Sequence, residues 1–353
     1  MKSMIRRVPI PIAGVMLGFA AFGNFLKSYS NLVWILMELV SVALLVLLVL
    51  KALLYPEDLR RDMKNPAIAG AAGTFSMGLM FLAVSLKSVS VPAGVSVWWA
   101  ALVLHAVLIV WFTASFVRCF QLKKVYMTWF LVYVGIVAAA ATSPAFGMQA
   151  LGRVLTVYGL AATSVLMILM AVRYRKLPSE KPLAPLTAIC AAPFSLCLVG
   201  YHQSFETKDP AVFLVIFLFS SAFYVLGLVQ VFRYIGGTFY PSFSGFTFPF
   251  INTAIGTRLT WNALRAGDWG KNLSGFVPGR GKDIVSVFLV LADVECIIAG
   301  ILLGIVFFRY VVFLSGKEQT AAAGTGRLRQ PMMPQEEKRG GYQKYARTHS
   351  HTS

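Results

Sequence analysis

Long runs of apolar residues with almost no charge dominate the pattern along the chain. Each run is near the length of about 20 residues that an α-helix needs to cross the hydrocarbon core of a bilayer. The apolar positions continue on all sides of each run, so the alternating strands of a membrane β-barrel, about ten residues each, fit poorly. Because backbone polar groups must be paired in lipid, the pattern predicts helices. The ten runs cover residues 9 to 26, 32 to 54, 66 to 86, 94 to 117, 126 to 143, 148 to 172, 183 to 202, 211 to 232, 245 to 264 and 284 to 314.

The composition agrees with this pattern. Of the 353 residues, 58% are hydrophobic and 13% are charged, which is about half of the charged share of a soluble domain, roughly 25%. The mean hydropathy is +0.71. These values argue against a soluble enzyme and predict one all-α polytopic membrane domain over residues 1 to 314.

Small residues are concentrated in alternate runs. The odd-numbered runs contain stretches rich in Gly, Ala, Ser and Thr, whereas the even-numbered runs are richer in Leu, Val and Ile. Small residues let helices approach closely, and bulky aliphatic residues suit contact with lipid. The sequence therefore predicts ten transmembrane helices as five helical hairpins in a quasi-fivefold arrangement, with the odd-numbered helices inside.

Positive charge is distributed unequally between the two sides of the predicted helices. Of the 32 Lys and Arg residues, 23 fall on the side that carries both termini, 8 fall on the other side, and Arg258 lies inside the ninth run. The positive-inside rule then places both termini in the cytoplasm. The basic and then apolar N-terminus is interpreted as a retained first span. We expect a multi-pass protein of the inner (plasma) membrane and, because the charges lie in short clusters between apolar runs, no nucleic-acid partner.

Candidate chemistry outside the membrane is sparse. Residues 315 to 353 are polar, Gly-rich and basic without apolar periodicity, which predicts a disordered cytoplasmic tail. The four cysteines show no CxxC or Cys/His ligand spacing, and the chain has only four His, so no metal site is predicted. Nucleotide-binding, zinc-protease and serine-hydrolase motifs are absent from the sequence, so we expect no catalytic residue, no cofactor and no enzymatic activity.

Four charged residues lie within the predicted helices: Glu38, Arg258, Asp293 and Glu295. An ion inside a membrane is costly and is normally paired or functional. Antiparallel ninth and tenth helices would bring Arg258 and Asp293 to a similar depth, so we expect a charge pair. A role of Arg258 in attracting anions or coupling protons is the alternative. Glu38, on an outer helix, is a candidate for contact with a neighbouring subunit, and His105 is interpreted as a packed or hydrogen-bonded side chain.

Four segments resemble one family of membrane proteins in their order and spacing over about residues 8 to 314. They are IPIAGVMLGFAAFGNF, EDLRRDMKNPAIAG, RKLPSEKPLAPLTAICAAPF and FTFPFINTAIGT. These segments resemble the TehA-type tellurite-resistance/dicarboxylate transporters (TDT family), bacterial relatives of the plant guard-cell slow anion channels. The resemblance implies a homotrimer in the lipid bilayer with a pore in each protomer, formed by the five inner helices and blocked midway by a Phe ring.

The resemblance also implies which residues form the pore. The gate would be Phe248, and Pro249 beside it would kink the helix. Pro193 matches the proline in the middle of the seventh span. The first, third and fifth spans lack the mid-helix proline of the family, so kinks there would come from glycines, namely Gly14, Gly18, Gly73 and Gly135.

Small polar side chains in the inner helices are candidates for weak solvation of an anion. Weak polar sites let an ion leave as well as enter a pore. The alternative for each hydroxyl is a hydrogen bond to its own helix backbone. The candidates are Ser76, Thr142, Ser195, Thr247 and Asn252.

The expected function is a gated passive anion channel that conducts small inorganic or organic anions. Two transport alternatives stay open, because the family implies them as well. One is a proton-coupled carrier of C4-dicarboxylates such as malate, and the other is an efflux transporter of tellurite or sulfite.

Overall fold

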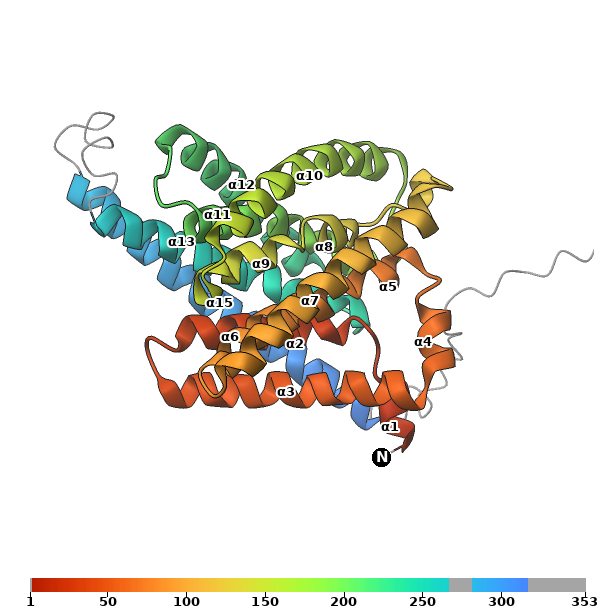
Figure 1. Ribbon diagram of the computed structural model, residues 1–353. Coiled ribbons are helices and arrows are strands. Elements are labelled where there is room, and N and C mark those ends of the chain that lie inside the picture. The colour runs from red at the N-terminus through yellow and green to blue at the C-terminus, as the bar shows by residue number, and fades with distance from the viewer. Residues whose placement is uncertain (1, 267–280, 317–353) are drawn as a thin grey trace, which may run out of the picture. The chain divides into compact units, whose positions relative to one another are not determined.

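The computed structural model describes residues 2–266 and 281–316. Within these ranges all regular secondary structure is helical (Figure 1), which confirms the predicted all-α class. The long helices are α3 (Asn31–Leu54), α7 (Val91–Phe112, extended by a π-helical turn, Thr113–Val117), α10 (Gln149–Lys176), α12 (Pro210–Tyr234) and α15 (Gly281–Ser315). The predicted tail, apart from Ser315 and Gly316, lies outside the described residues.

The remaining helices are shorter. They are α1 (Lys2–Arg7), α2 (Ile12–Leu26), α4 (Pro56–Asp62), α5 (Pro66–Ala71), α6 (Gly73–Lys87), α8 (Trp129–Tyr133), α9 (Val137–Thr142), α11 (Ala192–Ser204), α13 (Phe248–Ala266) and the 3-10 segments Leu122–Lys124, Ser143–Phe146, Ala184–Ala191 and Pro241–Phe246.

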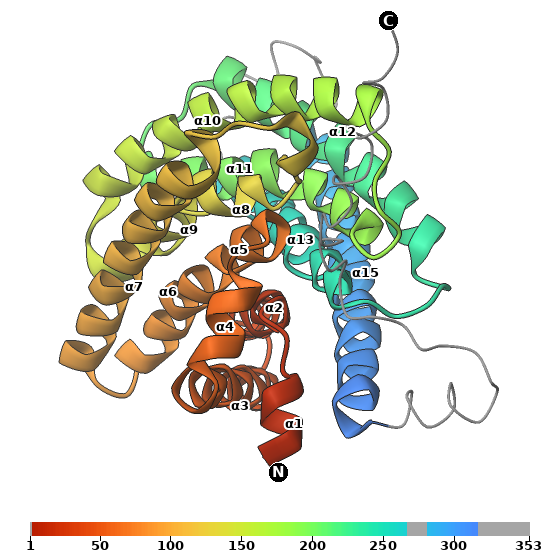
Figure 2. The same ribbon diagram turned by 90° about the vertical axis from the view of Figure 1, so that its right-hand side faces the viewer.

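The helices form an inner and an outer ring. Each inner helix packs against the long helix that follows it, in the pairs α2 with α3, α6 with α7, α9 with α10, α11 with α12 and α13 with α15. The inner helices also contact one another in the order α2, α6, α9, α11, α13, and α13 contacts α2, so the inner ring closes. Figure 2 shows α3, α7, α10 and α15 at the periphery and α2, α6 and α11 nearer the centre.

Burial separates the two rings. Only 17% of the apolar stretch in α3 and 22% of that in α7 is buried, compared with 72% for Pro66–Lys87 and 89% for Ala184–Ser204. An apolar surface left exposed on the long helices suits lipid. In the described part of the chain, seven helical stretches are long and apolar enough to cross a membrane. The protein is therefore a polytopic helical membrane protein, and the count of ten spans stays a prediction.

Capping side chains start several helices. The Ser30 hydroxyl accepts a hydrogen bond from the Val33 N–H at the start of α3. The Asp209 carboxylate accepts hydrogen bonds from the first two free N–H groups of α12, at 2.8 and 3.1 Å. The Asn65 side chain accepts one from Ala67 at the start of α5, at 2.9 Å. These contacts satisfy N–H groups that a helix start leaves unpaired, so α3, α5 and α12 each begin at a defined residue.

Four of the five inner segments are broken helices, in contrast to the long outer ones. The helix is interrupted between α5 and α6 next to Gly73, and between α8 and α9 at Gly135. The inner segments that end in α11 and α13 begin as 3-10 turns. By contrast, α2 runs without interruption through Gly14 and Gly18. The breaks thus occur at two of the four glycines singled out in the sequence.

Close backbone contact explains why glycine stands at position 73. A Cβ atom there would lie 2.5 Å from the backbone oxygen of Leu131 in α8, a separation that neither backbone can accommodate without moving. The break in the third span and the break in the fifth span therefore pack directly against each other.

Gly73→Ala is expected to lower stability, because the added methyl group overpacks this backbone contact at a cost of about 1–3 kcal/mol. Thermal unfolding in detergent measures the change. The matched control is Gly304→Ala in α15, where no heavy atom of the described residues lies within 4 Å of the new Cβ. There the higher helix propensity of Ala should leave the melting temperature unchanged or slightly raised. Equal melting temperatures for the two variants would contradict the packing argument.

Candidate functional site

Two narrow cavities lie within the inner ring, one on each side of Phe248. The cavity nearer the C-terminal ends of the inner segments is lined by Met77, Phe130, Leu131, Val134, Gly135, Ala192, Pro193, Leu196 and Phe248. The other is lined by Gly14, Ala71, Thr74, Leu131, Leu186, Ile189, Ser244, Gly245, Phe248 and Pro249. Each has a volume of about 10 Å³, which is about the space that a single water molecule needs.

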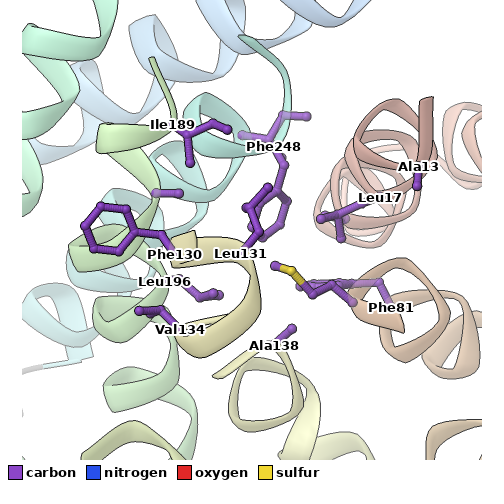
Figure 3. Close-up of a cluster of buried hydrophobic side chains, with 14 of the residues drawn as sticks. Ala13, Leu17, Phe81, Phe130, Leu131, Val134, Ala138, Ile189, Leu196 and Phe248 are labelled. Atoms are coloured by element: carbon purple, nitrogen blue, oxygen red, sulfur yellow. The ribbon is translucent and has the colours of Figure 1, made fainter. Parts of the chain in front are cut away.

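Phe248 and Leu131 are the two side chains that line both cavities. Phe248 is only 2% exposed, and its ring lies 6.0 Å from the ring of Phe81 in α6, edge to face. Figure 3 shows the Phe248 ring beside Leu131, with Leu17 and Phe81 on neighbouring helices. The space between the cavities is thus filled by apolar side chains from several inner segments.

The local sequence fixes the position of Phe248. The 3-10 segment Pro241–Phe246 ends one residue before α13 begins, and Thr247 separates the two. The Thr247 hydroxyl donates to the backbone oxygens of Gly14, at 3.0 Å, and Ser244, at 2.8 Å. Pro249 has no N–H to leave unpaired and suits the first turn of a helix. Together these residues anchor the start of α13 to α2, so Phe248 is held in the lining of both cavities.

The other predicted pore-lining residues divide into two groups. Gly14, Gly135, Pro193 and Pro249 line one of the two cavities. The rest lie in helix contacts beside them: Gly18, Gly73, Ser76, Thr142, Ser195, Thr247 and Asn252. At Gly18, for example, a Cβ would lie 3.1 Å from the Leu303 side chain of α15.

Hydrogen bonds within the protein occupy the predicted polar groups. The hydroxyls of Thr142 and Ser195 each donate to backbone oxygens three or four residues earlier. The Ser76 hydroxyl lies 2.7 Å from Nδ1 of His105 and 3.1 Å from the backbone oxygen of Gly73. The Asn252 amide donates to the Ser195 hydroxyl at 3.1 Å. The side-chain oxygen of Asn252 is buried and has no hydrogen-bond partner. The site as it stands therefore presents few free donors toward an anion.

Charged side chains are absent from the lining of both cavities, as judged from the residues that the structure describes. The lining consists instead of aliphatic, aromatic and small residues. No sequence pattern distinguishes Leu131, Ile189 or Leu196, because each is an apolar residue in an apolar helix. In the described ranges, no group of three His, Cys, Asp or Glu residues is placed to hold a metal ion.

Arg258 and Asp293 lie together, away from the two cavities. An Nη atom of Arg258 donates to an Oδ atom of Asp293. The guanidinium also lies over the rings of Tyr29, at 5.6 Å, and Trp261, at 5.1 Å. The Arg258 side chain is 12% exposed and that of Asp293 is 52% exposed. The pair thus joins α13 to α15 near the loop that follows α2.

Two further polar side chains in the membrane region have partners in the same chain. His105 of α7 accepts from Ser76 through Nδ1 at 2.7 Å and donates to the Val132 oxygen through Nε2 at 2.9 Å, a neutral tautomer inferred from the partners. This arrangement links an outer helix to the broken inner segments. Glu38 accepts from the Ser85 hydroxyl of α6 at 2.7 Å. Contact of Glu38 with a neighbouring subunit is therefore the wrong expectation, because the side chain is buried within the protomer.

These features define a class: a multi-pass helical membrane protein in which the inner helices form a closed ring around two small cavities lined mainly by apolar side chains. Comparison with protein families identifies the family. The model of the voltage-dependent anion channel family (SLAC1) matches residues 7–311, and the chain belongs to that family. This family includes TehA and the plant slow anion channels, so the resemblance found in the sequence is confirmed. No curated protein matches the chain. Family members are channels and transporters, which indicates an anion transport function.

Proposed function

We propose that the protein is a gated passive anion channel in which the Phe248 ring blocks the pore of each protomer. The observation that carries the proposal is the presence of Phe248 in the lining of both cavities. Leu131 lines both cavities as well, and we expect removal or rotation of the larger Phe248 ring to join the two spaces. The gate is thus assigned to a single residue held by Thr247 and Pro249.

The physical basis of closure is desolvation. An anion that enters an apolar constriction loses its hydration, and no protein cation replaces the lost water. An apolar constriction of this kind closes a pore by excluding water. The absence of charged ligands in the described lining also suits conduction, because an anion in the open pore would meet no strong binding site from which it could not leave.

A passive channel fits the lining better than a proton-coupled carrier does. Coupling requires a group that gains and loses a proton along the path of the substrate. Among the described residues that line the two cavities, none has a carboxyl or imidazole side chain. Two alternatives remain to be compared with the channel: coupled transport of dicarboxylates, and efflux of tellurite or sulfite. The experiment below distinguishes a passive channel from a coupled carrier.

The assembly belongs to the same proposal. We place the chain in the inner (plasma) membrane with both termini in the cytoplasm, since most Lys and Arg residues fall on that side. A homotrimer with one pore in each protomer follows from the family resemblance. The long helices keep broad apolar surfaces, which leaves room for contact with lipid and with a second copy.

Planar bilayer recording of the purified full-length protein tests this function. We expect discrete current steps that reverse near the equilibrium potential of the anion and that persist when the pH is equal on both sides. Small inorganic anions and C4-dicarboxylates should be compared at equal concentration. Transport that vanishes without a pH gradient would instead establish a coupled carrier and contradict the proposal.

A further inference from the structure

Basic side chains gather at one end of the inner ring. The inner helices all run in the same direction, because each is followed by an outer helix that returns, so their C-terminal ends lie at the same end of the molecule. Five of the basic residues there contact the neighbouring hairpin, and we call them the basic ring: Lys27, Lys87, Arg153, His202 and Arg258. Each of them reaches from its own hairpin to the next.

The first three contacts bind neighbouring hairpins through hydrogen bonds. Lys27, directly after α2, donates to the Ser88 hydroxyl at 3.0 Å. Lys87, the last residue of α6, donates to the backbone oxygen of Ala145. Arg153, near the start of α10, donates to the backbone oxygen of Ser204 at 3.4 Å.

Two further contacts close the ring. The His202 Nε2 atom shares a hydrogen bond with the Thr260 hydroxyl at 3.1 Å, which joins the fourth hairpin to the fifth. The Arg258 guanidinium lies over the Tyr29 ring, which joins the fifth hairpin back to the first. A contact of the same kind thus recurs at every hairpin boundary, although the sequence shows no repeat of the residues involved.

The placement of the cations opposes the field of the helix ends. A helix C-terminus carries a partial negative charge from its unpaired carbonyl groups. The N-termini of the outer helices lie at the same end but at the periphery (Figure 2), so near the opening the five inner C-termini would attract cations and repel anions. The backbone oxygens that Lys87 and Arg153 bind belong to such ends, since Ala145 follows α9 and Ser204 is the last residue of α11.

Lys87 and Arg153 are the two cations of the ring that bind helix-end carbonyl groups without an acidic partner among the described residues. Arg258 is paired with Asp293, whereas the Lys27 ammonium group donates to the Ser88 hydroxyl and lies 4.0 Å from the centre of the Trp34 ring. In the part of the chain that the structure describes, neither Lys87 nor Arg153 forms an ion pair. Their charges therefore set the sign of the potential at this end of the passage.

We propose that Lys87 and Arg153 determine the selectivity for anions over cations, by reversing the potential of the helix C-termini at this mouth of the channel. The inference rests on the proposed channel function and adds a location for charge selection that is separate from the gate. Selection at the mouth explains how an uncharged constriction can serve an anion channel.

The test uses the Phe248→Ala protein, in which we expect a larger current than in the parent. Reversal potentials are compared with and without the double substitution Lys87→Gln and Arg153→Gln. Reversal potentials are recorded in a tenfold KCl gradient. We expect the ratio of chloride to potassium permeability to fall by roughly fivefold or more, as expected for two unit charges acting through water on monovalent ions. The difference should shrink in 1 M salt, where the screening length is about 3 Å.

The charge-conserving pair Lys87→Arg and Arg153→Lys separates charge from shape. Rescue of the permeability ratio by this pair supports the proposal. An equal fall of the permeability ratio in both double variants would show that the two residues only link neighbouring hairpins, and this would overturn the proposal. An unchanged permeability ratio in the variant with Lys87→Gln and Arg153→Gln would overturn it as well. Absence of any anion current in the Phe248→Ala background contradicts the channel function itself, so the two failures are distinguishable.

Discussion

Phe248→Ala is expected to raise the basal anion conductance by at least about tenfold. The phenyl ring separates two cavities that each have about 10 Å³ of space, and its truncation joins them into one path that water can fill. Each 1.36 kcal/mol removed from the barrier gives a tenfold increase in rate, and the desolvation of an ion costs far more than that. Single-channel recording of the purified protein measures the effect.

Two neighbouring phenylalanines provide controls for the gate. Phe246 packs on Phe243, with ring centroids 5.0 Å apart, and Phe250 packs on Tyr224 at 5.5 Å. Both are fully buried, and neither lines a cavity. Their truncation to Ala should cost about 3–5 kcal/mol of stability and leave the closed pore closed. If Phe248→Ala folds normally and conducts no more than the parent, the gate assignment is wrong. If one of the control substitutions raises the conductance instead, the channel function is supported, but the gate is a residue other than Phe248.

The helical architecture could be predicted from the sequence because it follows from length and composition. A run such as residues 32 to 54 is apolar on all sides, and in lipid such a run has no stable alternative to a helix. The assignment of α3 to the outside and the stretch Ala184–Ser204 to the inside follows from residue size, because glycine and alanine permit close approach. These expectations depend on averages over many residues.

The details of the site could not be predicted, because they depend on single contacts. The break next to Gly73 is set by the backbone of Leu131, which lies in a different hairpin. Phe248 is one of 27 phenylalanines, and only the family resemblance and Pro249 distinguished it. The hydroxyl of Ser76 could bond either to an anion or to its own helix, and no periodicity decides between them. The partner of Glu38, Ser85, is 47 residues away, beyond the range of any local pattern.

Replacement of Asp293 by Asn is expected to destabilise the protein more than replacement of Arg258 by Gln. The Arg258 side chain is 12% exposed, whereas Asp293 is 52% exposed, so loss of Asp293 leaves the more buried charge without its partner. Breaking a buried pair from one side costs about 3–5 kcal/mol, and the exposure of Asp293 points to the lower end of this range. Thermal unfolding of both variants in the same detergent measures the difference.

The double variant Arg258→Gln with Asp293→Asn tests whether the two side chains stabilise the protein as a pair. Because it leaves no unpaired charge, it should be more stable than Asp293→Asn alone, and the double-mutant cycle should give a coupling energy of about 0.5–3 kcal/mol. The surface pair of Arg60 and Glu57 is the reference, because both of its side chains are exposed, by 77% and 85%. This pair should show the smaller coupling energy, since exposed pairs contribute little to stability. Additive losses for Arg258 and Asp293 would contradict a structural pair and revive a direct role of Arg258 in attracting anions.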